Sequence, residues 1–145
     1  MISAERLNLV APCGIDCGIC ELYTCRADAR LFSALTLRGI PTDKIPCDGC
    51  RPIGGKCPII KEDCETYKCV AEKKVEFCSD CAEFPCVKLH PSSKRADVLP
   101  HNMKVFNLCT IKRDGLEAFV ERSPEIKRRY YAGIMEIGKG PQLED

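Results

Sequence analysis

The sequence contains no tryptophan, and aromatic residues make up only 6% of its 145 residues. Large aromatic platforms are therefore not expected. Neither sign of charge predominates, because 22 Lys and Arg face 21 Asp and Glu for a formal net charge of +1. A surface built to attract polyanions is not indicated by this balance. Histidine is scarce, with only His90 and His101, so a histidine-based catalytic or metal site is not expected.

Long apolar stretches are also missing. No segment approaches the roughly 18 apolar residues that a membrane span needs, so we expect no membrane association. The first residues, MISAERLNLVAP, carry Glu5 and lack a basic start followed by an apolar run. A secretory signal is therefore not expected, and the chain is predicted to be cytoplasmic. Glycine-rich phosphate loops of the GxxxxGK[ST] or GxGxxG kind are absent as well.

Cysteine is abundant: the chain has 13, and twelve of them lie between Cys13 and Cys86. In the cytoplasm thiols are kept reduced and disulfides are rare. An odd count would also leave one thiol unpaired in a full disulfide framework. We therefore predict metal ligation, with a disulfide scaffold as the alternative if the compartment is oxidising.

The spacing of the cysteines supports this prediction. Three CxxC pairs occur, Cys17/Cys20, Cys47/Cys50 and Cys78/Cys81. A CxxC turn directs two sulfurs to one point while nearby backbone amides hydrogen-bond the thiolates, as in zinc ribbons and iron–sulfur loops. The predicted metal ligands are Cys13, Cys17, Cys20, Cys25, Cys47, Cys50, Cys57, Cys64, Cys69, Cys78, Cys81 and Cys86.

Twelve ligands would suffice for three four-thiolate sites, and the sequence leaves their grouping open. A sequential grouping gives Cys13/17/20/25, Cys47/50/57/64 and Cys69/78/81/86. A crossed grouping joins Cys47/Cys50 to Cys78/Cys81, as two knuckles grip one ion in zinc ribbons. Two sites with spare thiols are a third arrangement.

We favour zinc, two to three ions per chain, because closed tetrahedral thiolate sites suit Zn²⁺. An iron–sulfur cluster is the alternative, since it uses the same ligands and would point to electron transfer or redox sensing. Closed thiolate sites are not catalytic, so the balance is against an enzyme, although this stays undecided.

The segments CGIDCGIC, CDGCR and VEFCSDCAEFPCVKL resemble the uncharacterised cysteine-rich family called domain of unknown function 3795. The similarity runs from Cys13 to about Leu89, and the FCxxCxxFPC signature (residues 77–86) is fairly specific to it. The resemblance implies metal binding, with zinc as the expected metal. It implies no activity, because the family has no established one.

The predicted fold is a small metal-stapled domain, mainly α-helical, with irregular loops and few short strands. Zinc-ribbon-like knuckles occupy residues 1–86 and helices residues 101–137 of a single domain, 1–145. We expect helices over residues 26–39, 65–73 and 101–113, and a strand at Val75–Phe77. Asp114 would cap a further helix, and Ser123-Pro124 would start another that places Ile126, Tyr130, Ile134 and Ile137 on one face. The last eight residues are expected to fray.

The sequence also predicts the environment of one further cysteine, of two aspartates and of the basic residues. Cys109 is expected to be a buried packing thiol, and Asp16 and Asp80 to be solvent-facing loop carboxylates. The partner class stays open between protein and, more weakly, nucleic acid. A candidate nucleic-acid surface would use the basic residues Lys94, Arg95, Lys112, Arg113, Lys127, Arg128 and Arg129. Solvated helix faces are the simpler interpretation of these charges.

Overall fold

The computed structural model describes residues 1–89 and 103–144, and helices dominate these ranges. The α-helices are α1 (Ala4–Asn8), α2 (Glu21–Thr24), α3 (Ala29–Leu37), α4 (Glu65–Lys73), α5 (Met103–Asp114) and α6 (Leu116–Ala132). Short 3-10 helices are η1 (Cys17–Ile19), η2 (Cys25–Ala27), η3 (Thr42–Lys44), η4 (Cys78–Asp80) and η5 (Val87–Leu89). The strands are β1 (Ile134–Glu136) and β2 (Gly140–Gln142). Helix exceeds strand in the described ranges, as the sequence predicted.

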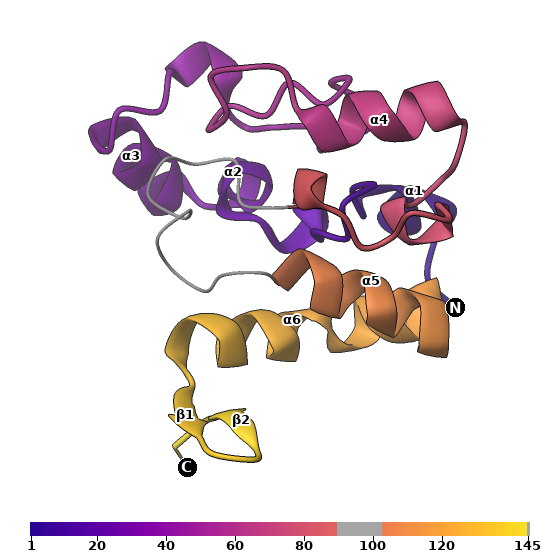
Figure 1. Ribbon diagram of the computed structural model, residues 1–145. Coiled ribbons are helices and arrows are strands. Elements are labelled where there is room, and N and C mark those ends of the chain that lie inside the picture. Colours follow the sequence, from indigo (N-terminus) through magenta and orange to yellow (C-terminus); the bar gives the residue numbers. More distant parts are fainter. Residues whose placement is uncertain (90–102, 145) are drawn as a thin grey trace.

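The helices lie on two sides of the cysteine-rich segments. In Figure 1, α5 and α6 pack side by side below these segments, and α4 lies above them. Helix α1 packs against α6, and the 3-10 helix η4 packs against α5. The 3-10 helix η4 is therefore held by α5, and η1 is held by α6, whose Lys127 donates to the Ile19 carbonyl at 2.6 Å.

Helix α3 begins and ends where the sequence indicates. The Asp28 carboxylate caps it, accepting hydrogen bonds from the amides of Arg30 and Leu31 at 3.0 Å each. Gly39, with φ of +90°, follows the helix end and adopts the left-handed conformation that glycine tolerates best. The predicted helix over 26–39 is confirmed, with its first residues in η2 instead of the α-helix.

Helix α4 matches its predicted range of 65–73, but the strand predicted at Val75–Phe77 is wrong. Lys74 adopts a left-handed conformation, with φ of +55°, that ends the helix and turns the chain. The backbone of Phe77 then leads directly into η4, and its side chain is buried in the main core. The apolar residues here serve a turn that buries Phe77, not a β-ladder.

Helix α6 is continuous where the sequence predicted two helices. Pro124 has no amide hydrogen to donate to the Val120 carbonyl, which would normally weaken the helix at that point. The Ser123 hydroxyl lies 3.0 Å from this carbonyl and 2.5 Å from Asp16 Oδ2, so its single proton is shared between the carbonyl and the closer carboxylate. Asp114 is the last residue of α5 and pairs with Arg113 and Arg122, while Gly115 occupies the cap position of α6.

The C-terminal residues form a hairpin, so the predicted fraying is wrong for Gly140–Gln142. Strands β1 and β2 pair antiparallel, with Ile134 opposite Gln142. The hairpin extends below α6 in Figure 1. Ile134 and Ile137, predicted to share a helical face with Ile126 and Tyr130, lie beyond the end of α6 and are exposed. Gly133, where a Cβ would lie 2.5 Å from the Arg129 carbonyl, lets the chain leave the helix.

Buried side chains form two clusters. The larger joins both ends of the described chain, with Val10 and Phe77 packed with Leu108 and Phe119. The smaller is formed by Leu22, Cys25, Leu35 and Ile45, with Cys20, Cys47 and Cys57 packed against it. The cysteine-rich segments therefore lie at the edges of two apolar clusters.

None of the described helices is both long and apolar enough to cross a membrane.

Candidate metal centre

All thirteen cysteines lie in the described ranges, and each carries a free thiol. Two of the three CxxC pairs adopt the same local structure, a 3-10 turn that begins at the first cysteine. In η4 the Cys81 amide donates to the Cys78 carbonyl at 3.2 Å, and in η1 the Cys20 amide donates to that of Cys17 at 3.1 Å. These bonds hold the two cysteines of each pair close together along the chain.

Aspartate side chains brace both turns. Asp80 Oδ2 accepts the Phe77 amide at 2.9 Å, which closes the η4 turn from its C-terminal side. Asp16 Oδ1 accepts the Gly18 amide at 2.9 Å, which closes η1 from its N-terminal side. Each CxxC turn is thus fixed by one carboxylate, which leaves the cysteine thiols free for other contacts.

Four cysteines from three segments line one cavity of about 340 Å³. Cys69 comes from α4, Cys78 and Cys81 come from η4, and Cys86 lies directly before η5. The sequential grouping predicted for these four residues is therefore gathered in space. Lys73 and Lys88 also line the cavity, together with Glu83 and several apolar residues.

Hydrogen-bond donors surround the sulfurs of this cavity. Lys73 Nζ lies 3.3 Å from Cys81 Sγ, and Lys88 Nζ lies 3.5 Å from Cys69 Sγ. The Glu83 amide donates to Cys81 Sγ at 3.4 Å, while its carboxylate pairs with Lys73. The amide of Glu83 and the ammonium of Lys73 lower the pKa of the Cys81 thiol. The environment of this thiol therefore favours the thiolate form that binds metals.

The other thiols of the cavity act on one another. Burial and, to a smaller extent, the neighbouring thiols of Cys86, Cys69 and Cys81 raise the pKa of Cys78 to about 11. Like charges cannot gather here without a compensating cation. Within residues 1–89 and 103–144, however, no three His, Cys, Asp or Glu side chains converge tightly enough to hold one ion. The four cysteines supply the donor chemistry of a thiolate metal site without its final geometry.

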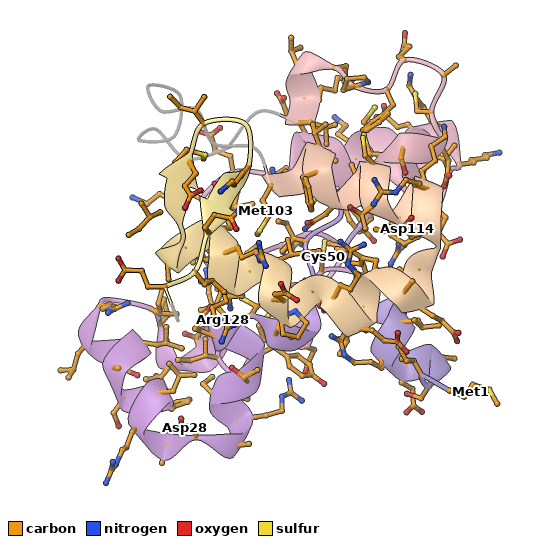
Figure 2. All side chains as sticks on the ribbon, turned by 90° about the horizontal axis from the view of Figure 1, so that it is seen from below. Met1, Asp28, Cys50, Met103, Asp114 and Arg128 are labelled. Carbon is orange, nitrogen blue, oxygen red and sulfur yellow. The ribbon has the colours of Figure 1, made fainter. Side chains whose placement is uncertain are left out.

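Seven further cysteines form a second network, of which Cys20, Cys47 and Cys57 pack against the smaller apolar cluster and Cys13 against the larger one. Burial raises the pKa of Cys50, and so do nearby thiols, of which Cys13, Cys17 and Cys64 act most strongly. Burial also raises the pKa of the Cys57 thiol, and the neighbouring thiols of Cys20, Cys47 and Cys64 act in the same direction. In Figure 2, Cys50 lies near the middle of the view, whereas Met1 and Asp28 lie toward its edges.

Comparison with known proteins agrees with the sequence motifs. Residues 9–91 match the family model described as "Protein of unknown function (DUF3795)". The chain belongs to the DUF3795 family. No curated protein and no solved structure matches it. The DUF3795 match covers every cysteine of both networks and stops before α5, so α5 and α6 lie outside the matched segment.

Two cysteines of this DUF3795 member lie apart from the networks. Cys25 is buried, and its thiol donates to the Leu22 carbonyl at 3.4 Å. Cys109 is exposed, so its prediction as a buried packing thiol is wrong. Helix α5 buries Asn107, Leu108, Thr110 and Ile111, and its periodicity places Cys109 on the solvent side.

Asp16 also differs from its prediction, because its carboxylate is buried. It accepts hydrogen bonds from Arg6 at 2.8 and 2.6 Å and from the Ser123 hydroxyl at 2.5 Å. It therefore ties α1, the η1 turn and α6 together. Asp80 is solvent-exposed, as predicted. A buried Asp directly before a CxxC pair carries no sequence signal that would separate it from a loop carboxylate.

The basic residues proposed for nucleic-acid binding are partly engaged within the chain. Arg113 pairs with Asp114, Lys127 with Glu21 and Arg129 with Glu125. Lys94 and Arg95, like His90 and His101, fall outside the described residues. Sequence analysis did not single out Lys73, whose ammonium lies 3.3 Å from Cys81 Sγ. Its position one helical turn after Cys69 was the signal that both side chains share a face of α4.

Proposed function

We propose that this DUF3795 protein is a metal–thiolate protein whose Cys69, Cys78, Cys81 and Cys86 bind one zinc ion. The observation that carries the proposal is the gathering of these four cysteines around one cavity, with donors aimed at their sulfurs. Thiolates are the ligands that zinc takes in closed structural sites. Three of the four, Cys78, Cys81 and Cys86, are the cysteines of the FCxxCxxFPC signature.

The charges around the cavity support a dianionic centre. Four thiolates around Zn²⁺ leave a net charge of −2. The ammonium groups of Lys73 and Lys88, which contact Cys81 and Cys69, supply two positive charges. Ligands of this kind gain orientation and affinity from such outer contacts. If these thiols only filled space, the contacts of Lys73 and Lys88 with their sulfurs would have no explanation.

The centre has a structural role in this proposal. Its ligands join α4 to η4 and to the segment before η5. Metal binding to such a segment is folding free energy, on the order of 10 kcal/mol for small zinc sites. We therefore expect residues 65–89 to lose their structure when the metal is removed.

An iron–sulfur cluster is the second candidate, and one observation favours it. The four cysteines line a cavity of about 340 Å³ and do not converge on a single point. A cluster with several irons and sulfides fills more space than one zinc ion, and it uses the same cysteine ligands. In that case the lysine contacts would tune a reduction potential instead of stabilising a closed site.

The deciding experiment is metal analysis of protein purified without oxygen, combined with a visible spectrum. Zinc without visible absorbance supports the first candidate, and iron with acid-labile sulfide and a brown colour supports the second. Cys78→Ser is expected to lose the metal of this cavity, whereas Cys109→Ser, at an exposed site outside both networks, should keep all of it. Wild-type protein without bound metal, or a Cys78→Ser protein that retains every ion, would refute the proposal.

A further inference from the structure

The η4 turn, which carries two ligands of the proposed metal centre, is held by a side chain from outside the segment that matches DUF3795. We propose that Lys112 of α5 is a positioning residue for this centre and acts through the backbone carbonyl of Ser79. The inference rests on the proposed function and extends it, because it makes a C-terminal helix part of the metal site. Helix α5 begins at Met103, beyond the matched residues 9–91.

The contact joins a lysine ammonium to a buried backbone acceptor. Lys112 Nζ donates a hydrogen bond to the Ser79 carbonyl at 3.2 Å. Ser79 directly follows Cys78 and lies inside the CxxC turn, and only 2% of it is exposed. A buried carbonyl that loses its partner costs about 1–3 kcal/mol, because water cannot take the place of the donor. The ammonium therefore fixes the peptide unit that follows Ser79.

The backbone of this turn is held from two sides. The Cys78 amide donates to the Pro12 carbonyl at 2.9 Å, and the Cys81 amide closes the turn by donating to the Cys78 carbonyl at 3.2 Å. Lys112 adds a bond from the side of α5, one residue after Cys78. The backbone on both sides of Cys78 is thus fixed, while its side chain lines the cavity of the proposed centre.

Helix α5 brings the lysine to the turn through its apolar face. Leu108, four residues before Lys112, is fully buried and belongs to the larger apolar cluster together with Phe77 and Cys78. Residues four apart lie on the same face of a helix, so the packing of Leu108 directs Lys112 toward η4. A lysine can lay its stem along apolar surface while its ammonium reaches a polar partner. The docking of α5 therefore determines where the ammonium lies.

The other C-terminal helix holds the η1 turn in a similar way. Lys127 of α6 donates to the Ile19 carbonyl at 2.6 Å, inside the turn of Cys17 and Cys20. Each of the two C-terminal helices thus places one ammonium on a carbonyl of one CxxC turn. The repetition on a second turn argues against a chance surface contact.

A positioning role and a purely structural role for Lys112 differ in what metal removal does. If the contact stabilises the turn in the arrangement that binds metal, its loss weakens metal binding and leaves the stability of the metal-free chain unchanged. A contact that only attaches η4 to α5 stabilises the metal-free and the metal-loaded chain equally. Its loss would then lower the stability of both and leave the metal affinity unchanged.

The test measures the zinc affinity of the site that Cys78→Ser abolishes, by chelator competition, in three variants of α5. Lys112→Met should bind zinc about 10-fold more weakly, the lower end of what outer contacts contribute. Lys112→Arg keeps a donor for the Ser79 carbonyl and should restore the wild-type affinity. Arg113→Met is the matched control, because Arg113 is the next residue of the helix and pairs with Asp114.

A spectrum and a stability measurement complete the test. With Co²⁺ in place of zinc, Lys112→Met should change the visible bands that report ligand geometry, and Lys112→Arg should restore them. Urea unfolding of the metal-free chain should be the same for wild type and Lys112→Met. If the cavity holds an iron–sulfur cluster, its reduction potential takes the place of zinc affinity, since outer contacts tune it.

The outcomes separate this inference from the proposed function. Unchanged affinity in Lys112→Met, or an equal loss in Arg113→Met, would overturn the inference and leave the proposed function intact. Lower stability of metal-free Lys112→Met with unchanged affinity would assign Lys112 a structural role and overturn it as well. A wild-type chain that binds no metal in this cavity would refute the proposed function itself.

Discussion

The buried carboxylate of Asp16 offers the sharpest test of how the N-terminal turn is held to the C-terminal helices. Only 2% of its side chain is exposed, and it accepts hydrogen bonds from Arg6, Gly18 and Ser123. Replacing Asp16 with Ala removes all of these bonds at once. It also leaves the Arg6 guanidinium without its acidic partner.

The expected cost follows from these contacts. Breaking a buried ion pair by removing one partner costs about 3–5 kcal/mol, because the other charge is left uncompensated. The Arg6 side chain is 27% exposed and can be partly rehydrated, so we lower the expected loss to about 2–4 kcal/mol. With a urea m-value of about 2 kcal/mol/M, the unfolding midpoint should fall by about 1–2 M.

Asp80 provides the matched control, because it braces the other CxxC turn from an exposed position. Its carboxylate accepts one backbone amide, so Asp80→Ala should cost only about 0.5–1 kcal/mol. Both variants are unfolded in urea with excess zinc, followed by circular dichroism. If Asp16→Ala lowers the free energy of unfolding by no more than Asp80→Ala does, the Asp16 carboxylate does not stabilise the packing of α1 and η1 against α6.

Three further predictions concern single positions. Gly49→Ala should destabilise the chain by about 2 kcal/mol more than Gly39→Ala, as measured by urea titration. Both glycines have a positive φ, but only a Cβ at Gly49 would meet a side chain, that of Leu9 at 2.9 Å. Pro124→Ala should raise the melting temperature, because it restores a backbone amide inside α6 and should stabilise the chain by about 1–3 kcal/mol. An unchanged or lower melting temperature would show that the Ser123 hydroxyl already satisfies the Val120 carbonyl. Lys73→Met should weaken metal binding about 10-fold in chelator competition, because it removes the contact of Lys73 with Cys81 Sγ. The control Lys61→Met should leave metal binding unchanged. Equal effects of the two substitutions would exclude the contact with Cys81 as the cause.

Much of the helical framework follows from local sequence signals. Helix α4 matched its predicted range, and α3 has the Asp cap and glycine end that its sequence indicates. The errors arise where a distant residue changes the local preference. Ser123-Pro124 has a strong start signal, but Ser123 is used by Asp16, which lies 107 positions away, and by the Val120 carbonyl. No local pattern contains that information.

The candidate site shows the same limit at the level of grouping. Spacing predicted a grouping of Cys69, Cys78, Cys81 and Cys86, and these four cysteines line one cavity in the structure. For the other CxxC pairs, the sequential and crossed groupings stay predictions. A Cβ on Gly49 would lie 3.8 Å from Cys17 Cβ, and spacing along the chain carries no information about such an approach between distant segments.

The positions of the cysteines explain why so small a chain needs them. Cys13 and Cys78 pack against the larger apolar cluster, while Cys20, Cys47 and Cys57 pack against the smaller one. A domain of this size buries a limited fraction of its surface, and two separate clusters stabilise it less than one continuous core would. A metal held by Cys69, Cys78, Cys81 and Cys86, as proposed, would add bonds between α4, η4 and the segment before η5 that apolar contact cannot supply. Such bonds would supplement the core of a chain that has no tryptophan and few aromatic residues.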